Sequence, residues 1–175
     1  FLGQIHKHAS DREKIPQNLA NPFREHTLPK EAKQSYGFMS DDTLRDILTA
    51  IPRSSFDPWP AVVARHSGMR ISEICSSELR EVDGVLCFAI EDAKTAAGAR
   101  LVPVRESLID VVRERKPSWV NHDAISKQFG NRKRKLGLDR SQSFHSLRVT
   151  FTTLVARAGY RMEECAWLVG HEEGK

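Results

Sequence analysis

Asp83-Gly84 lies between two short strand-like segments, residues 78–82 and 85–90, near the middle of the chain. Asp-Gly suits a two-residue hairpin turn, in which both residues take a positive φ. A third strand-like segment covers residues 99–104. Three short strands make only a small sheet, so helices must supply most of the core.

Helical spacing begins after Ser40. Leu44, Ile47, Leu48 and Ile51 recur at i, i+3, i+4 and i+7, and Pro52 ends the pattern. Asp57-Pro58 is a cap followed by a first-turn proline and opens a second helix. A short helix is predicted to continue through Arg70 to Ser77. Further helices are predicted over residues 106–115, 122–136, 144–158 and 161–169. The predicted fold class is mainly α with a small three-stranded antiparallel sheet (α+β).

The two last helices carry apolar stripes of their own. In residues 144–158 the predicted buried stripe is Leu147, Phe151, Leu154, Val155 and Ala158. Gly159 is the expected left-handed stop. In the next helix the predicted face is Met162, Cys165, Ala166 and Val169.

With 175 residues, 39% of them hydrophobic, the chain can bury one substantial core. Residues 1–36 are polar, contain three prolines and are interpreted as a connector. The formal charge of +4 suits a polyanionic partner, although many proteins have a similar charge. The three cysteines are widely spaced and indicate neither a disulfide framework nor a metal knuckle, so a reduced compartment is expected. No signal peptide or long apolar run is present, which predicts a soluble protein.

Two pairs of residues are candidates for binding a phosphate. His145 and Arg148 are three residues apart at a predicted helix start, where free N–H groups also attract anions. Arg70 and Glu73 have the same spacing, so the carboxylate can hold the guanidinium in place. The alternatives are a capping histidine with a solvated arginine, and a plain surface ion pair.

Single residues complete the candidate set. Lys94 lies in the predicted hairpin loop 91–98, and His171 follows Gly170 after the last helix. A solvated lysine and a helix-terminal histidine are the alternatives here. Arg132, Lys133, Arg134 and Lys135 form the densest basic run and are predicted to contact the DNA backbone, with a solvated helix end as the alternative.

In this order, the motifs resemble the catalytic domain of the tyrosine recombinase (phage integrase) family. Ser67–Glu73 matches the box around the family's first arginine, and Lys94-Thr95 followed by Arg100–Val104 matches its lysine hairpin. His145–Arg148 matches H-x-L-R, and Leu168–His171 matches L-G-H. The resemblance implies the family's catalytic-domain fold over residues 37–175, truncated before the C-terminal nucleophile segment. Residues 1–36 would be the end of a core-binding domain and the interdomain linker.

The resemblance also implies a mechanism. A tyrosine attacks the scissile phosphate, forms a 3′-phosphotyrosyl bond and frees a 5′-hydroxyl, without metal, ATP or other cofactor. Arg70 and Arg148 would bind the non-bridging oxygens, Lys94 would be the general acid, and His145 and His171 would hydrogen-bond the phosphate, with Glu73 supporting Arg70. Neither Tyr36 nor Tyr160 matches the nucleophile, which is therefore expected beyond Lys175, and the chain as given is expected not to cut DNA.

The implied partners are a double-stranded DNA attachment site and, in the full-length synaptic complex, three further copies in a homotetramer. No membrane is implied, the chain alone is compatible with a monomer, and the expected location is the bacterial cytoplasm at the nucleoid. A phage or another mobile element is the expected source. Three alternatives stay open: a non-catalytic DNA-binding relative, a type IB topoisomerase-like strand transferase, and a helical protein-interaction domain whose basic residues are solvated.

Overall fold

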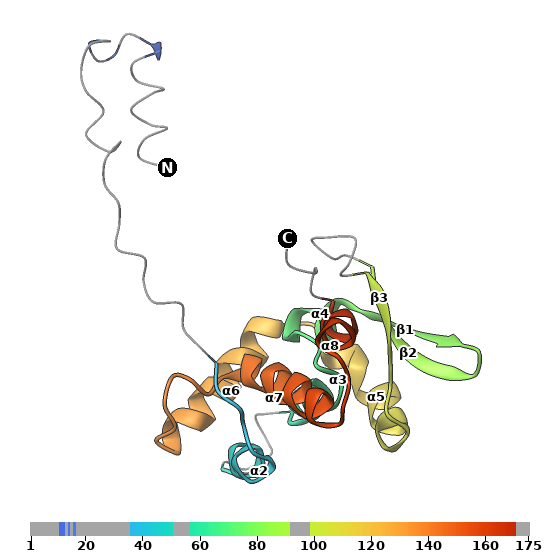
Figure 1. Ribbon diagram of the computed structural model, residues 1–175. Helices are drawn as coiled ribbons and strands as arrows, with labels where there is room; N and C mark the ends of the chain where they lie inside the picture. The colour runs from blue at the N-terminus through green and yellow to red at the C-terminus, as the bar shows by residue number, and fades with distance from the viewer. Residues whose placement is uncertain are drawn as a thin grey trace. The chain divides into compact units, whose positions relative to one another are not determined.

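The chain forms two units, Phe1–Gln34 and Ser35–Lys175, in the computed structural model (Figure 1). The structure describes residues 11, 12, 14, 16, 36–50, 57–91 and 99–170. In the first unit only four residues are described, with one helical residue at Asp11. The elements below all belong to the second unit.

A three-stranded antiparallel sheet has the order β1-β2-β3. The strands are β1 (Glu78–Val82), β2 (Val85–Ile90) and β3 (Arg100–Pro103). Val82 pairs with Val85 across the turn, and Asp83 and Gly84 have φ values of 50° and 77°. The Asp-Gly hairpin is thus confirmed, because both turn residues take the left-handed conformation that this turn requires.

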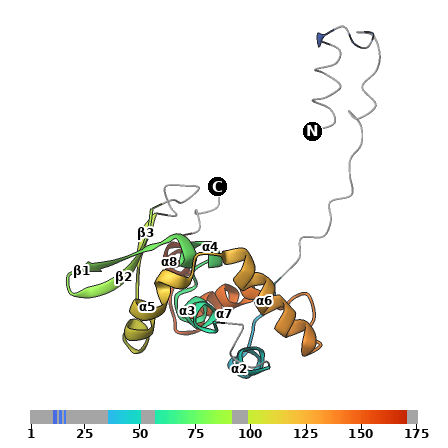
Figure 2. The ribbon, with the colours of Figure 1, turned by 180° about the vertical axis from the view of Figure 1, so that it is seen from behind.

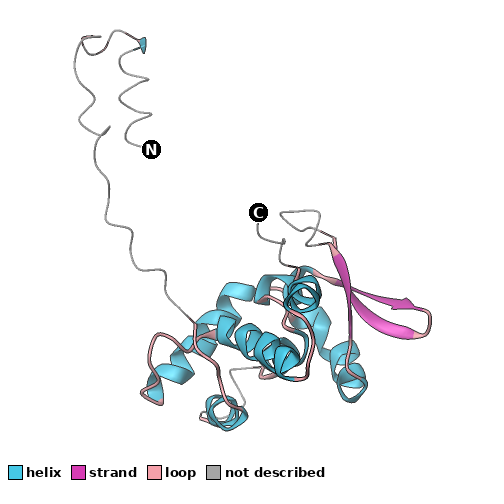
Figure 3. Ribbon diagram, in the orientation of Figure 1, coloured by secondary structure: helices cyan, strands magenta, loops and turns pink. Residues whose placement is uncertain are grey.

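Helices form the rest of the described unit and surround one end of the sheet, from which the β1-β2 hairpin projects (Figures 1 and 3). The α-helices are α2 (Asp41–Thr49), α3 (Trp59–Ser67), α4 (Ile71–Ser76), α5 (Ile109–Arg115), α6 (His122–Lys135), α7 (Phe144–Arg157) and α8 (Met162–Val169). Two short 3₁₀ helices, η3 (Glu106–Leu108) and η4 (Lys116–Ser118), flank α5. The predicted α+β class is therefore confirmed.

The core is formed by buried side chains of α2 to α7 and of strands β2 and β3. The view from behind shows α3 beside α7 within this group of helices (Figure 2). The largest buried side chain of the core is Trp119, whose indole Nε1–H donates to Asp57 Oδ2 at 2.7 Å. The other carboxylate oxygen of Asp57 accepts from the Trp59 backbone N–H at 3.1 Å. One aspartate therefore binds the first N–H of α3 and satisfies the buried indole.

Two sequence predictions about the helices are wrong in detail. The chain does not continue as a helix through Arg70, because Gly68 takes a left-handed φ of 66° and Arg70 is extended, so α4 begins at Ile71. The buried stripe of α7 is also shifted. Its buried residues are Phe144, Ser146, Leu147, Arg148 and Thr150. The later stripe positions are only partly buried or, at Ala158, exposed, because tertiary packing covers the first half of α7.

The predicted face of α8 is confirmed only in part. Cys165 and Val169 are buried, whereas Met162 is 74% exposed in the first turn. Ile51 and Pro52 lie outside the described residues.

Candidate phosphate-binding site

Glu73 is the centre of a cluster of arginines. Its Oε1 accepts from Arg70 Nη1 at 2.6 Å, and its Oε2 accepts from Arg100 Nη2 at 3.0 Å. Arg148 Nη1 lies 4.0 Å from the same Oε2. Burial by itself raises the pKa of Glu73, but the hydrogen bonds and charges of Arg100 and Arg70 outweigh it and lower the pKa. One ionised carboxylate thus holds three guanidinium groups within its reach.

Local backbone geometry places Arg70 beside Glu73. Arg70 is the residue before α4, and its backbone N–H donates to Glu73 Oε2 at 2.8 Å. The carboxylate therefore caps the helix and fixes the side chain of its own capping residue. The Arg70 side chain remains 41% exposed, so its guanidinium is accessible to an anion from solvent.

Arg148 is held far more tightly. Its Nη1 donates to the Gly68 carbonyl at 2.8 Å and its Nη2 to the Val169 carbonyl at 2.5 Å. Only 3% of the side chain is exposed, and its Nε–H is buried without a hydrogen-bond partner in the described part of the chain. Burial, and then repulsion from Arg70, lower the pKa of Arg148 to about 10, against the opposing effect of Glu73. It remains a cation at neutral pH, and its Nε–H is not used in a hydrogen bond among the described residues.

Gly68 makes this arrangement possible. A Cβ at this position would lie 2.4 Å from Cδ1 of Phe151, and the φ of 66° is unfavourable for any other residue. The tight turn brings the Gly68 carbonyl to Arg148 and ends α3 just before Arg70. The small residue before Met69 in the sequence thus allows α3 and α7 to approach closely.

His145 lies in the first turn of α7, whose N-terminus is capped by Ser143. The Ser143 Oγ accepts from the His145 N–H at 3.2 Å, and the Ser143 N–H donates to Ser146 Oγ at 2.9 Å. Burial, followed by the charges of Arg148 and Arg70, lowers the pKa of His145. The imidazole is therefore neutral at pH 7 and lies in the field of both arginines.

The structure brings four of the predicted site residues together: Arg70, Glu73, His145 and Arg148. Lys94 and His171 lie outside the described residues, so their roles stay predictions. Sequence reasoning missed Arg100, which is only 9% exposed and also donates from Nε to the Leu168 carbonyl at 3.2 Å. The sequence feature that could have identified Arg100 is its position as a charged residue at the start of an otherwise apolar strand.

The four basic residues at the end of α6 differ in how deeply they are buried. Arg132 is only 2% exposed, and its Nη1 donates to the Leu48 carbonyl at 2.9 Å and to the Ile47 carbonyl at 3.3 Å. The structure therefore corrects the prediction for Arg132, because this guanidinium ties α6 to α2 and is not available to DNA. Arg134 and Lys135 are exposed, and Lys133 donates to the Asp139 carbonyl at 2.6 Å.

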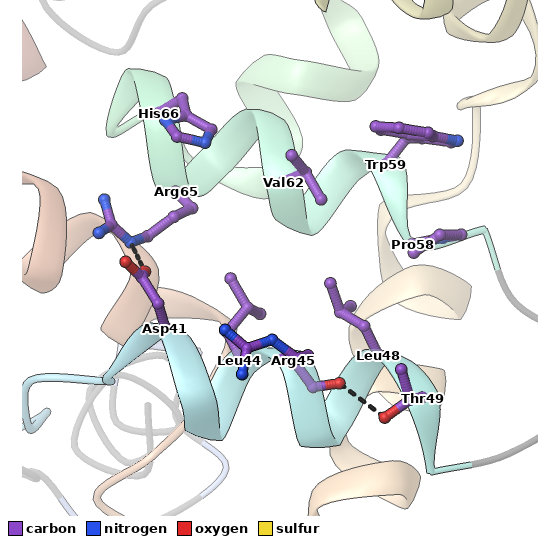
Figure 4. Close-up of a pocket in the computed structure, with 10 residues that line it drawn as sticks. All are labelled: Asp41, Leu44, Arg45, Leu48, Thr49, Pro58, Trp59, Val62, Arg65 and His66. Atoms are coloured by element: carbon purple, nitrogen blue, oxygen red, sulfur yellow. Dashed lines mark hydrogen bonds and ion pairs between the residues drawn. The ribbon is translucent and has the colours of Figure 1, made fainter.

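A separate cavity of about 520 Å³ lies between α2 and α3. Figure 4 shows Leu44, Leu48 and Val62 between the two helices, with the Asp41–Arg65 ion pair at one end. None of the predicted site residues lines it. The arginine cluster around Glu73 therefore remains the candidate functional site.

The described residues contain no cluster of three metal-ligating side chains. Among these same residues, no helix is long and apolar enough to cross a bilayer.

Several solved structures resemble the chain, and three of them show the range of similarity. A lambda integrase dimer bound to a COC′ core site has a TM-score of 0.68 at 17% identity, covering 99% of this chain and 55% of that one. The Tn1549 transposon integrase in complex with a circular intermediate DNA has a TM-score of 0.59 at 17% identity, covering 98% and 69%. XerA recombinase has a TM-score of 0.57 at 17% identity, covering 84% and 58%.

The chain has the tyrosine-recombinase catalytic-domain fold. This fold confirms the structural expectation from the sequence motifs, and the chain spans 55%, 69% and 58% of the lengths of the three recombinase structures. No protein-family model matches the chain, and no curated protein matches it either.

Proposed function

We propose that the chain is the catalytic part of a site-specific DNA recombinase or integrase of the tyrosine recombinase family. It would break and rejoin DNA strands through a 3′-phosphotyrosyl intermediate, without metal or ATP. The observation that carries the proposal is the gathering of Arg70 and Arg148 on one carboxylate, 2.6 Å and 4.0 Å from its oxygens, beside His145. Fixed positive charge of this kind stabilises the extra negative charge of a pentacoordinate phosphate.

In this proposal each arginine has a different way to reach the phosphate. Arg70 is partly exposed and can turn its guanidinium toward a non-bridging oxygen. Arg148 uses both Nη groups on backbone carbonyls and its Nε–H is buried, so this side chain has to shift before it can bind a phosphate oxygen. Glu73 holds Arg70 and Arg148 near one carboxylate, so both cations are already gathered when the phosphate arrives.

The other roles follow from the motif match. Lys94 would protonate the leaving 5′-oxygen, and His145 and His171 would hydrogen-bond the phosphate and assist proton transfer. The nucleophilic tyrosine would lie beyond Lys175, since the family's nucleophile follows the L-G-H motif and both Tyr36 and Tyr160 precede Leu168–His171. The phosphoester energy is retained in the phosphotyrosyl bond, so no ATP is consumed.

The proposed partner is double-stranded DNA carrying an attachment site, and the proposed cellular location is the bacterial cytoplasm at the nucleoid. One of the similar structures is a lambda integrase tetramer bound to a Holliday junction, and we propose a tetramer for the synaptic complex here too. Lys133, Arg134 and Lys135 at the end of α6 would contact the DNA backbone. Such contacts give affinity rather than sequence choice.

A suicide substrate tests the proposal. The protein expressed from its gene, with any residues that follow Lys175, is incubated with nicked duplexes from the DNA flanking that gene. We expect a covalent protein–DNA adduct on a denaturing gel, and we expect Arg148→Ala to abolish it while much of the DNA binding remains. Arg157→Ala is the matched control, because Arg157 is an exposed arginine at the other end of α7.

The other outcomes are distinct. DNA binding without any adduct would identify a non-catalytic DNA-binding relative. If Arg148→Ala changes neither binding nor adduct formation, the arginine cluster is not a phosphate site and the proposal fails.

A further inference from the structure

The last residues before α2 lie along α7. The Gly37 N–H donates to the Ser141 carbonyl at 2.9 Å, just before α7 begins. The buried Met39 bonds twice to Thr150: its N–H donates to Thr150 Oγ1 at 2.8 Å, and its carbonyl accepts from that hydroxyl at 3.2 Å. These bonds join residues more than a hundred positions apart and fix the segment 36–39 against the helix that carries His145 and Arg148.

This anchoring brings an aromatic ring onto His145. The ring centroids of Tyr36 and His145 are 4.8 Å apart, and the rings are tilted by 56°. Both values lie in the range of a favourable aromatic contact. An imidazole in the first turn of a helix has two rotatable bonds and would otherwise sample several orientations.

We propose that Tyr36 is a positioning residue that holds the imidazole of His145 toward the arginine cluster. The inference rests on the proposed recombinase function and deepens it, because it makes the segment before α2 part of the site. Tyr36 itself does not touch the phosphate in this proposal. It acts through His145, and the hydrogen bonds of Gly37 and Met39 hold it in place.

The charges around His145 define what the contact should do. Among the described residues, Arg148 on its own helix, Arg70 before α4 and the phenol of Tyr36 are the titratable or charged groups that influence or contact it. Burial is the largest cause of its lowered pKa. Removing the Tyr36 ring admits water to one face of the imidazole, so the pKa of His145 should rise toward its ordinary value.

The test compares three variants of the complete chain. Tyr36→Ala removes the ring, Tyr36→Phe keeps it without the hydroxyl, and Phe38→Ala removes a neighbouring aromatic that lies over Arg157 instead, 5.3 Å from its guanidinium carbon. The first readout is the pH titration of the His145 ring by nuclear magnetic resonance, assigned with His145→Gln. We expect a raised pKa and lost ring–ring contacts in Tyr36→Ala, and wild-type values in the other two.

The second readout is the single-turnover rate of adduct formation by the protein expressed from its gene. Tyr36→Ala should slow it by roughly tenfold and move its pH profile with the His145 pKa, and Tyr36→Phe should recover most of the rate. Far-ultraviolet circular dichroism checks that each variant is folded. If Tyr36→Ala does not fold, Tyr36→Ser, which removes the ring and the apolar bulk, takes its place with the same expectations.

An unchanged pKa and orientation of His145 in Tyr36→Ala would overturn the inference, whatever the rate. If no variant and no wild-type protein forms an adduct, the proposed function fails, and the titration still decides whether Tyr36 positions His145. A rate loss of the same size in Phe38→Ala would show a general effect of the segment and also overturn it.

Discussion

At the scale of single residues, the candidate site depends on one carboxylate that balances positive charge and on one glycine that allows close packing. Glu73 is surrounded by Arg70, Arg100 and Arg148, so its carboxylate balances positive charges that would otherwise repel one another inside the fold. Gly68 supplies the carbonyl that binds Arg148 at the one place where no side chain fits. The site is therefore built on one carboxylate and one glycine.

The first prediction concerns Gly68. Gly68→Ala should lower the free energy of unfolding by roughly 2–4 kcal/mol. An alanine is strained in the left-handed conformation at this position, and its Cβ would also clash with Phe151. Urea denaturation measures the loss. Gly84→Ala is the control, because Gly84 also has a positive φ, of 77°, but has no atom within 4 Å of the added Cβ. Equal losses in the two variants would exclude the contact with Phe151 as a cause.

The second prediction concerns pH and Glu73. The folded pKa of Glu73 is lowered from 4.5, so its contribution to stability is present above pH 4.5 and is lost as the pH falls through the folded pKa. Glu73→Gln should remove that contribution and flatten the acid limb of the stability curve. Unfolding free energies of both proteins between about pH 3 and 7 test this. Parallel curves would show that Glu73 does not titrate differently on folding.

At the scale of elements, two polar side chains join helices that are distant in sequence. Asp57 lies two residues before α3, accepts from the N–H of its first residue, and binds Trp119, which follows η4. Arg132 comes from the last turns of α6 and binds the last carbonyls of α2. A helix leaves these carbonyls without intrahelical partners, so a buried guanidinium there satisfies both.

The third prediction separates Arg132 from its neighbours. Arg132→Ala should cost about 2–4 kcal/mol of stability, because it removes packing and leaves buried carbonyls unpaired. Lys135→Ala should change stability by less than about 0.5 kcal/mol, since the side chain is exposed. Thermal unfolding measures both. If Arg132→Ala left the stability unchanged, water would be replacing the guanidinium at the α2 carbonyls without loss of stability.

At the scale of the whole molecule, the cationic groups fall into two sets. Arg100, Arg132 and Arg148 are buried or nearly so and hold elements together, whereas Arg134 and Lys135 lie on the surface at the end of α6. The exposed set, Arg134 and Lys135, can exchange counterions for DNA phosphates without any change in the fold. The net charge of +4 gives the overall balance of charges, but it does not show which cations are buried and which are exposed.

The fourth prediction follows from the exposed set. The 175-residue chain should bind duplex DNA weakly, lose affinity steeply with salt, and form no covalent adduct. Lys135→Ala should reduce the slope of log affinity against log salt by about 0.9, the value for one phosphate contact. Fluorescence anisotropy at several salt concentrations measures the slope. A salt-independent affinity would exclude backbone contacts, and an adduct would require a nucleophile within residues 1–175.

The sequence alone determined the elements whose formation is local. Asp83-Gly84 specified the hairpin because both residues accept a positive φ, and Ser40 and Asp57 specified helix starts because their side chains accept from N–H groups that follow them. The order of the motifs also predicted that Arg70, Glu73, His145 and Arg148 lie in one site.

Only the tertiary structure decided which polar groups meet across the chain. Arg132 looked like its basic neighbours until the carbonyls of α2, 84 and 85 positions away, were placed beside it. Arg100 and Tyr36 joined the site through contacts with Glu73 and His145 that no local pattern records. Such contacts depend on how helices pack, and that packing is set by the shape of the whole core rather than by the sequence next to each residue.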